Sequence, residues 1–384
     1  MNILMITKWY PYEKDPQMGV FIQKHARAIA LSNKIHVIYA YSAERQKEKF
    51  LHRESENGNL TEHRISYQKD TSPLSKIINA QRYKQAVEMV VDTLTHRGFK
   101  ADILHAYILL RTGWMARQLS RKLNIPYIIS EQWSGYATGK YAAQSSVVKR
   151  LTKSVLKDAA GLTVVSEFLR DKMVSQGLSH PRTIITPNIV EPRNSDHPTQ
   201  NKSKKIAVLM VADQVDEIKN ISGVIRAVEE IAKHRNDFEL RIIGHGKDQL
   251  RLMRMTEEKG LLNSVIHFEG LKDNNEVYAY LHRSDFLVMN SRFETFSLIC
   301  CEAMSCGKPV LATRCGGPES FVNSDTGILI PVDHHEDLVS GLEKMLDSFQ
   351  DFHAEKIRES VEKRFSIETL SLTFSNFYEK VTKP

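Results

Sequence analysis

Short runs of apolar residues alternate along this chain with longer stretches in which apolar residues recur at helical spacing. In the first half, the apolar runs expected to form strands cover residues 2–7, 35–40, 102–107, 127–130 and 162–165. Helices are expected between them, roughly at 19–31, 77–94, 113–123 and 147–158. Strands that alternate with helices favour a parallel sheet covered by helices on both faces. The strand segments are apolar throughout, as parallel strands buried on both faces are.

A polar, proline-rich segment interrupts this alternation near the middle of the chain. Residues 187–203 read PNIVEPRNSDHPTQNKS and contain three prolines, a composition typical of an interdomain linker. The alternation then restarts, with strands expected at 206–211, 239–243, 264–268, 286–289, 310–312 and 327–330. We therefore expect an α/β protein of two Rossmann-like, doubly wound domains that face a central cleft, with ligands at the carboxyl ends of the strands.

The predicted N-terminal domain spans residues 1–187, the linker 188–204 and the C-terminal domain 205–365. The last helix, 366–384, is expected to pack back on the N-terminal domain. The two halves differ in charge. Residues 1–195 hold 29 basic and 16 acidic side chains, a net charge of +13, whereas the whole chain is +7 and the remainder is therefore −6. This asymmetry suggests that the two domains meet different partners.

Simple features exclude several classes of protein. No apolar run approaches the roughly 20 residues that a membrane-spanning helix needs. The N-terminal sequence MNILMITKWYPY has no basic region before its short apolar stretch, which makes it a poor signal peptide. The four cysteines, at 300, 301, 306 and 315, lack C-x2-C spacing, so buried thiols are favoured over a zinc site. We expect a cytoplasmic protein.

The segment with the strongest chemical signal covers residues 289–320. A strand is expected to end at Met289, a loop carries Glu294, and a helix begins near Ser297 and carries Glu302. The free N–H groups at such a helix start form an anion site, and carboxylates accept hydrogen bonds from sugar hydroxyls. The combination favours a ligand that has both a phosphate and hydroxyl groups.

Glu294 and Glu302, eight residues apart, open a pattern that resembles the E-x7-E region of retaining GT-B glycosyltransferases of family 4, also called group 1 glycosyltransferases. Its other residues are Ala303-Met304, Gly307, Pro309-Val310 and Gly316-Gly317-Pro318-Glu319. The resemblance extends from about residue 186 to 348 through Asn188, Lys219, Ile243-Gly244-His245-Gly246 and Phe268-Glu269-Gly270. The N-terminal half resembles the family more loosely, through Gly19-Val20 and Asp102-Ile103-Leu104-His105.

The resemblance implies a hexosyltransferase-like enzyme that uses a nucleoside-diphosphate sugar, retains anomeric configuration and needs no metal or other cofactor. It implies that Glu294 holds hydroxyls of the donor sugar, that Glu302 binds the ribose and that Lys219 neutralises the diphosphate leaving group. A cation and oriented amides stabilise such developing charge better than water does. The donor-binding positions implied in this way are Gly19, Lys219, Gly244, Gly246, Gly270, Glu294, Thr295, Phe296, Ser297, Leu298 and Glu302.

The sequence departs from the family pattern at three places. Asp213 stands where the family usually has an arginine about six residues before its lysine, and Asn220 replaces the usual glycine after Lys219. Gln132 stands where the N-terminal domain of the family often has a histidine. A neutral amide cannot act as a base, so that role is either lost or carried by Glu131 or His105. The catalytic candidates are therefore Glu294, Lys219, His105 and Glu131.

A basic amphipathic helix is expected near residues 147–158, where Lys149, Lys153 and Lys157 recur at i, i+4 spacing. Such a helix either is an ordinary solvated face or lies on an anionic membrane surface. The resemblance supports attachment to the inner face of a membrane, because bacterial members often extend lipid-linked sugars. We therefore expect a lipid-linked or saccharide acceptor, in polysaccharide or lipid-linked glycan synthesis. No nucleic-acid motif accompanies the charge, so no nucleic acid is expected.

The sequence is also compatible with two other functions. One is a GT-B nucleotide-sugar epimerase or a phosphorylase-like enzyme, although no pyridoxal-type lysine motif is identifiable. The other is a non-catalytic nucleotide-sugar-binding protein, which the departures at Asp213 and Gln132 would allow. A nicotinamide-binding motif is not favoured, because Gln249 stands where the third glycine of G-x-G-x-x-G would be.

Overall fold

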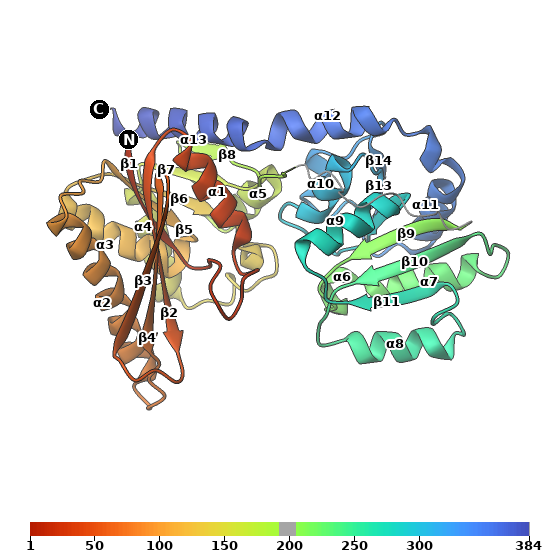
Figure 1. Ribbon diagram of the computed structural model, residues 1–384, viewed down its shortest axis with the longest axis horizontal. Coiled ribbons are helices and arrows are strands. Elements are labelled where there is room, and N and C mark those ends of the chain that lie inside the picture. The colour runs from red at the N-terminus through yellow and green to blue at the C-terminus, as the bar shows by residue number, and fades with distance from the viewer. Residues whose placement is uncertain (192–204, 384) are drawn as a thin grey trace. The chain divides into compact units, whose positions relative to one another are not determined.

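The computed structural model describes residues 1–191 and 205–383 of the chain. These residues divide into two compact units (Figure 1). Unit 1 consists of Met1–Ile189 together with the C-terminal helix α13 (Ile367–Thr382), and unit 2 consists of Val190–Ser366. The two-domain α/β architecture expected from the alternation is therefore present.

Unit 1 is built on an eight-stranded sheet with the strand order β3-β4-β2-β1-β5-β6-β7-β8. All its neighbouring strands pair in parallel except β3 and β4, which form an antiparallel hairpin. The strands are β1 (Asn2–Thr7), β2 (Lys34–Ala43), β3 (Phe50–Asn57), β4 (Leu60–Gln68), β5 (Ile103–Tyr107), β6 (Tyr127–Glu131), β7 (Gly161–Val164) and β8 (Thr183–Ile185). The helices are α1 (Val20–Ala30), α2 (Ser75–His96), α3 (Trp114–Leu123), α4 (Ser146–Asp158), α5 (Glu167–Ser175) and α13.

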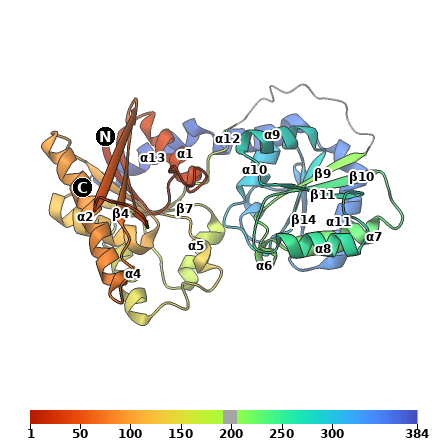
Figure 2. The ribbon, with the colours of Figure 1, turned by 60° about the horizontal axis from the view of Figure 1, so that its bottom comes forward.

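The C-terminal helix α13 returns to the core of unit 1. It lies beside α1, and both helices pack on the same face of the sheet (Figures 1 and 2). Phe374 and Tyr378 of α13 are completely buried there, next to Ile22 of α1 and Ile3 of β1. Because burial of an aromatic side chain stabilises a fold by a few kcal/mol, α13 is an integral part of this unit.

Unit 2 is built on a six-stranded, all-parallel sheet with the strand order β11-β10-β9-β12-β13-β14. Its strands are β9 (Ile206–Val211), β10 (Phe238–Ile243), β11 (Ile266–Gly270), β12 (Phe286–Met289), β13 (Val310–Thr313) and β14 (Gly327–Ile330). The helices, which cover both faces of the sheet (Figure 2), are α6 (Asp216–Lys219), α7 (Ile221–Ile231), α8 (Gln249–Glu258), α9 (Asn274–Arg283), α10 (Leu298–Ser305), α11 (His335–Ser348) and α12 (Ala354–Phe365).

Two local features differ from the sequence expectations. The hairpin of β3 and β4 and the edge strand β8 were not predicted; most side chains of β3 are exposed and polar, and β8 has only three residues. The predicted linker, 188–204, begins inside the folded structure, where Ile189 and Val190 are buried. Its residues 192–204 lie outside the described part of the chain.

Candidate active site

A lysine and a glutamate of unit 2 form a short ion pair. Lys219 ends α6, and Glu294 lies in the loop between β12 and α10. Lys219 Nζ donates to Glu294 Oε1 at 2.6 Å, and Ser291 Oγ donates to the same oxygen at 2.9 Å. Burial by itself lowers the pKa of Lys219, but the charge of Glu294 and its hydrogen bond outweigh burial and raise that pKa. The lysine therefore stays cationic at neutral pH.

The backbone at Asn220 explains one departure from the family pattern. Asn220 separates α6 from α7 and has a left-handed conformation with φ of +46°. Glycine adopts this conformation without strain, and asparagine is among the few other residues that tolerate it. Asn290 Nδ2 also donates to the Asn220 carbonyl at 3.1 Å. The asparagine therefore preserves the turn that a glycine would make.

Arg292 joins the loop of Glu294 to the helix of Lys219. Its backbone N–H donates to the Ile218 carbonyl at 2.7 Å, and its Nη1 donates to the carbonyls of Asp216 and Glu217 at 2.8 and 2.9 Å. These bonds hold the two segments together around the ion pair. Sequence reasoning missed Arg292, because no local pattern marks it apart from its position two residues before Glu294.

Asp213 lies in the loop after β9, where the family usually has an arginine. Its side chain is exposed, and its charge is among the influences that raise the pKa of Lys219. An exposed carboxylate is well solvated, so it opposes a nearby diphosphate less than a buried one would. The structure thus places Asp213 near Lys219 without forming the arginine–lysine pair of the family.

Three glycines gather at the carboxyl ends of neighbouring strands. A Cβ atom on Gly244 would lie 1.9 Å from the Ala212 carbonyl oxygen, and one on Gly246 would lie 2.5 Å from that of Gln214. The Gly244 N–H donates to the carbonyl of Gly270, which has a φ of +71°. The loops after β9, β10 and β11 therefore approach one another more closely than side chains at Gly244 and Gly246 would permit.

The loop from Glu294 leads directly into α10, as the sequence predicted. Ser297 precedes the helix with a left-handed φ of +73°, and Leu298 is its first residue. The first N–H groups of any α-helix have no partner within that helix. The N-terminus of α10, which includes the backbone of 298, therefore offers N–H groups four residues after Glu294. Thr295 lies between them in the same loop.

Phe296 follows Thr295 in this loop, where the resemblance implies that the backbone amides near 296–298 hold the diphosphate. Its side chain is buried against Phe321 and Phe365, with ring centroids 5.5 and 5.2 Å away. A Cβ on Gly317 would lie 2.5 Å from the Phe296 backbone, so the Gly316-Gly317 pair allows two loops to touch. The side chain of Phe296 is therefore not available to a ligand. Glu302 lies within α10 and is half-buried.

His105 of unit 1 lies in the protein core. It is completely buried on β5; its Nδ1 is 2.7 Å from the Tyr378 hydroxyl, and its Nε2 is 2.6 Å from Ser130 Oγ. Burial, together with the nearby His25, lowers the pKa of His105 well below its usual range, so the ring is neutral. Because both ring nitrogens bond to the protein, the geometry argues against a catalytic role for His105.

Glu131 ends β6 as a completely buried carboxylate. Its two oxygens accept backbone N–H groups from Leu109, Gln132 and Trp133 at 2.8–2.9 Å, and a fourth bond from the Tyr136 hydroxyl at 2.9 Å. Burial raises the pKa of Glu131, against the effect of these bonds. Four donors fully occupy the carboxylate, which indicates that it organises the loops at the end of the sheet. Gln132 lies beside it in this loop.

Lys8 is a residue of this region that sequence reasoning missed. It follows β1, and its ammonium lies 5.0 Å from the centroid of the Trp9 ring and 5.7 Å from that of Trp133. Burial lowers the pKa of Lys8, while Glu131 acts in the opposite direction. The sequence signal that could have identified Lys8 is its position directly after the first expected strand.

Gly19 makes the turn into α1. It has a φ of +65°, and a Cβ there would lie 2.6 Å from the carbonyl carbon and oxygen of Trp9. Any other residue would be strained and would collide with the loop after β1. The structure therefore requires the glycine for close packing of two backbone segments.

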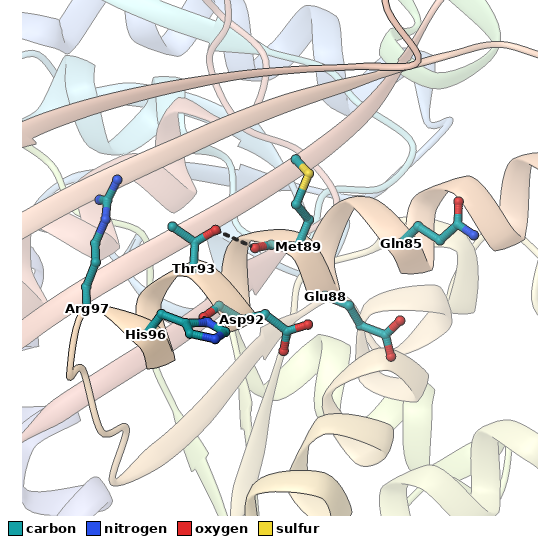
Figure 3. A pocket seen from close by; sticks show the side chains of 7 residues that line it. All are labelled: Gln85, Glu88, Met89, Asp92, Thr93, His96 and Arg97. Atoms are coloured by element: carbon teal, nitrogen blue, oxygen red, sulfur yellow. Dashed lines mark hydrogen bonds between the residues drawn. The ribbon is translucent and has the colours of Figure 1, made fainter.

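Two surface pockets lie away from these residues. One of about 690 Å³ is lined by side chains from the exposed side and end of α2 (Figure 3), namely Gln85, Glu88, Met89, Asp92, Thr93, His96 and Arg97. A second, of about 430 Å³, lies at the edge of unit 2 and includes Arg314, Asn323 and Lys356. Neither includes a residue that the sequence assigned to the site.

The predicted basic helix is α4. Arg150, Lys153 and Lys157 are exposed on it, and Val147 and Leu151 leave 73% and 42% of their surface exposed next to them. A helix with exposed basic and apolar residues together has the amphipathic character of a membrane-surface helix. Among the described helices, none is both long enough and apolar enough to span a membrane.

Comparison with known proteins places this geometry in a family. Residues 192–364 match the family model for glycosyl transferases group 1, and residues 22–188 match that for the glycosyl transferase 4-like domain. A curated relative, an uncharacterized glycosyltransferase of Methanocaldococcus jannaschii, is 25% identical over 100% of this chain and 99% of its own length.

Solved structures show the same fold. Sucrose-phosphate synthase from Thermosynechococcus elongatus superposes with a TM-score of 0.76 at 17% identity, over 99% of this chain and 98% of its own. HepE of Anabaena, solved in complex with UDP, gives a TM-score of 0.74 at 14% identity, over 99% of this chain and 100% of its own. With both halves matched by the family models, the chain belongs to the group 1 glycosyltransferases and has their two-domain GT-B fold.

Proposed function

We propose that the chain transfers a sugar from a nucleoside-diphosphate donor, bound by unit 2, to an acceptor bound by unit 1, with retention of anomeric configuration. The observation that carries this proposal is the Lys219–Glu294 ion pair, at 2.6 Å, in the loop that leads into α10. The pair and the helix start that follows Glu294 supply a partly buried cation, a carboxylate and free N–H groups, the three kinds of group that a nucleotide sugar needs.

The chemistry of the donor explains these groups. When the bond between the anomeric carbon and the diphosphate breaks, the electron pair stays on the diphosphate oxygen and negative charge develops there. The Lys219 ammonium and the N–H groups at the start of α10 offset this charge. Glu294 accepts hydrogen bonds from hydroxyls of the sugar and keeps the pKa of Lys219 high. With this positive charge in place, we expect the reaction to need no metal ion.

We propose a uridine diphosphate sugar as the donor. The support is the fold shared with HepE, which was solved with UDP. The glycine loops after β9, β10 and β11 are the segments that would take the base and the phosphates, and Glu302 on α10 would accept hydrogen bonds from the ribose.

The acceptor that we propose is a lipid-linked or saccharide precursor of a polysaccharide or lipid-linked glycan. Residues 1–195 carry a net charge of +13, which favours an acidic acceptor or an anionic membrane surface. The exposed basic and apolar side chains of α4 support attachment to the inner face of a membrane.

Two measurements test the proposal. Thermal unfolding with UDP, GDP or ADP at about 100 times the dissociation constant is expected to show stabilisation by about 2.7 kcal/mol for the correct nucleotide. Incubation with the matching radiolabelled nucleotide sugar is then expected to move the label to an acceptor. Stabilisation by none of the nucleotides would contradict the donor assignment. An epimerised nucleotide sugar, or binding without transfer to any saccharide or lipid-linked acceptor, would contradict the transferase assignment.

A further inference from the structure

Three histidines and a glutamate lie on one face of the sheet in unit 1. His36 comes from β2, His52 and Glu54 from β3, and His63 from β4. Glu54 pairs directly with His63 across the antiparallel hairpin. His52 lies two residues from Glu54 and therefore shares its face. His36 lies two residues before Ile38, the partner of His63, and so it also faces this side.

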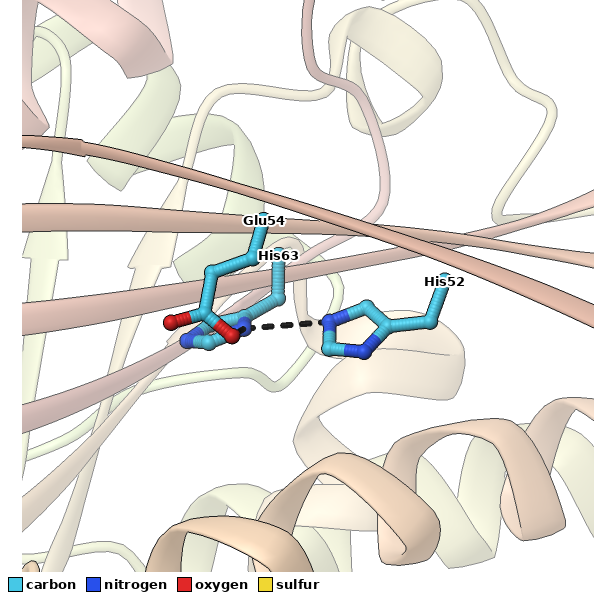
Figure 4. Close-up of side chains that lie close together, drawn as sticks. All are labelled: His52, Glu54 and His63. Carbon is cyan, nitrogen blue, oxygen red and sulfur yellow. Dashed lines mark hydrogen bonds and ion pairs between the residues drawn. The ribbon is translucent and has the colours of Figure 1, made fainter.

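Three of these side chains point their ligand atoms at one place (Figure 4). His52 Nε2 lies 3.1 Å from His63 Nδ1, and Glu54 Oε2 lies 3.8 Å from the same nitrogen. All three ligand atoms lie within 4.8 Å of one another. Ligands of a tetrahedral zinc ion, at bond lengths of about 2.1 Å, are about 3.4 Å apart. The observed distances bracket that value, so small side-chain movements would suffice to enclose an ion.

The fourth residue, His36, fixes how His63 presents its nitrogens. His63 Nε2 lies 2.9 Å from His36 Nδ1. If His63 carries its proton on Nε2 and donates it to His36, then Nδ1 has a free lone pair towards His52 and Glu54. A metal-bound histidine commonly donates its other N–H to a neighbouring acceptor in this way. The contact with His36 is therefore compatible with the tautomer of His63 that metal binding needs.

Glu54 is held in a comparable way. Arg97 Nη1 donates to both of its oxygens, at 2.9 and 2.8 Å. This bond orients the carboxylate and leaves lone pairs on Oε2 for an ion. His63 is buried, whereas Glu54 is partly exposed, so an ion can enter from solvent and water can complete its coordination.

We propose that His52, Glu54 and His63 bind one divalent transition-metal ion of the zinc type, with His36 and Arg97 as positioning residues. Imidazole and carboxylate ligands are those that zinc accepts, and three protein ligands leave a position for water. The site is separate from the proposed sugar transfer, because the donor residues belong to unit 2. A bound ion would link the exposed edge strand β3 to β4 beyond their backbone hydrogen bonds.

The direct test is a Zn²⁺ titration of the full chain. The protein is purified without a polyhistidine tag, stripped with a chelator and titrated in competition with a chromophoric chelator. One equivalent is expected to bind. His52→Ala and Glu54→Gln are each expected to weaken binding by about 100-fold or more, and His36→Phe by about 10- to 100-fold, the usual effect of losing a group that orients a ligand.

A matched control is available in unit 2. His234 and Glu343 form an exposed pair at 2.9 Å outside the proposed site, and His234→Ala should leave Zn²⁺ affinity unchanged. Co²⁺ bound to the unaltered protein should give the visible absorption of a tetrahedral site, which checks the proposal without any variant. The proposal would be overturned if His52→Ala and Glu54→Gln left Zn²⁺ binding unchanged, or if the unaltered protein bound no stoichiometric Zn²⁺. The three histidines would then only hydrogen-bond to one another.

Discussion

Lys219 Nζ and Glu294 Oε1 lie 2.6 Å apart although 75 residues separate them in the sequence. Hydrogen bonds from the backbone N–H and the side chain of Arg292 to carbonyls of α6 hold the two segments beside each other. The charged pair is therefore assembled by the fold before any donor binds. Such preorganisation lowers the cost of stabilising charge in the transition state.

The turn at Asn220 gives a prediction about stability. Asn220→Ala is expected to be less stable than Asn220→Gly by about 1–2 kcal/mol, because alanine is strained at a φ of +46°. Both variants lose the asparagine Oδ1 that accepts from Arg292, so their difference isolates the backbone. Urea unfolding followed by circular dichroism measures it, and equal stabilities would show that the left-handed turn imposes no such constraint.

Unit 1 is expected to lose stability as the pH falls below about 6.5. Burial lowers the pKa of His25 to about 4, although its hydrogen bond to the Pro187 carbonyl acts in the opposite direction. In the unfolded chain the ring titrates near pH 6.5, so between these values the unfolded state binds more protons. The free energy of unfolding should then fall by up to about 1.4 kcal/mol per pH unit for this group.

The same effect can be assigned to one residue. His25→Gln removes the titrating ring. Between pH 6 and pH 5, unfolding of this variant should take up about one proton fewer than unfolding of the unaltered protein, so its free energy of unfolding should fall less steeply as the pH decreases. The three tryptophans, Trp9, Trp114 and Trp133, all lie in unit 1, and their fluorescence reports its unfolding in urea. A variant with the same pH slope as the unaltered protein would refute the assignment.

Glu131→Gln distinguishes an organising from a catalytic carboxylate. An amide cannot accept all four hydrogen bonds that Glu131 accepts, so this variant is expected to destabilise unit 1 by about 1–3 kcal/mol. Glu56→Gln, an exposed change on β3, is the control and should change stability by less than about 0.5 kcal/mol. Loss of turnover at unchanged stability of Glu131→Gln would instead favour the catalytic role.

The exposed face of α4 predicts salt-sensitive binding to anionic vesicles. Lys153→Gln and Lys157→Gln should each weaken binding by about 1 kcal/mol, or about fivefold. The effect should fade as salt shortens the range of the interaction. Lys233→Gln, an exposed change in unit 2, serves as the control in sedimentation with vesicles. Equal binding of all three variants would refute a membrane role for this face.

The alternation of apolar runs predicted both sheets, because parallel strands buried on two faces carry a strong local signal. It missed the hairpin of β3 and β4 and the short edge strand β8; the residues of β3, FLHRESEN, are mostly polar because an edge strand has few buried positions. The order of Glu294, Ser297 and Glu302 likewise predicted the loop that leads into α10.

The tertiary contacts of the site could not be predicted in this way. Nothing near His105 in the sequence reveals that Tyr378, 273 residues away, bonds to its ring. The sequence around His105 is therefore compatible with a catalytic base, and only the hydrogen-bond partners of its ring argue against that role. The hydrogen bonds of Arg292 could not be predicted for the same reason, because their acceptors lie in a helix that is distant in the sequence.

Turnover of Lys219→Met with the radiolabelled nucleotide sugar tests the central claim most directly. Loss of one group that stabilises developing charge costs about 10²- to 10³-fold in kcat. We expect a decrease of that size in folded Lys219→Met protein, while the exposed control Lys233→Met retains full turnover. A Lys219→Met variant that transfers sugar as fast as the unaltered protein would contradict the assignment of the leaving-group charge to Lys219.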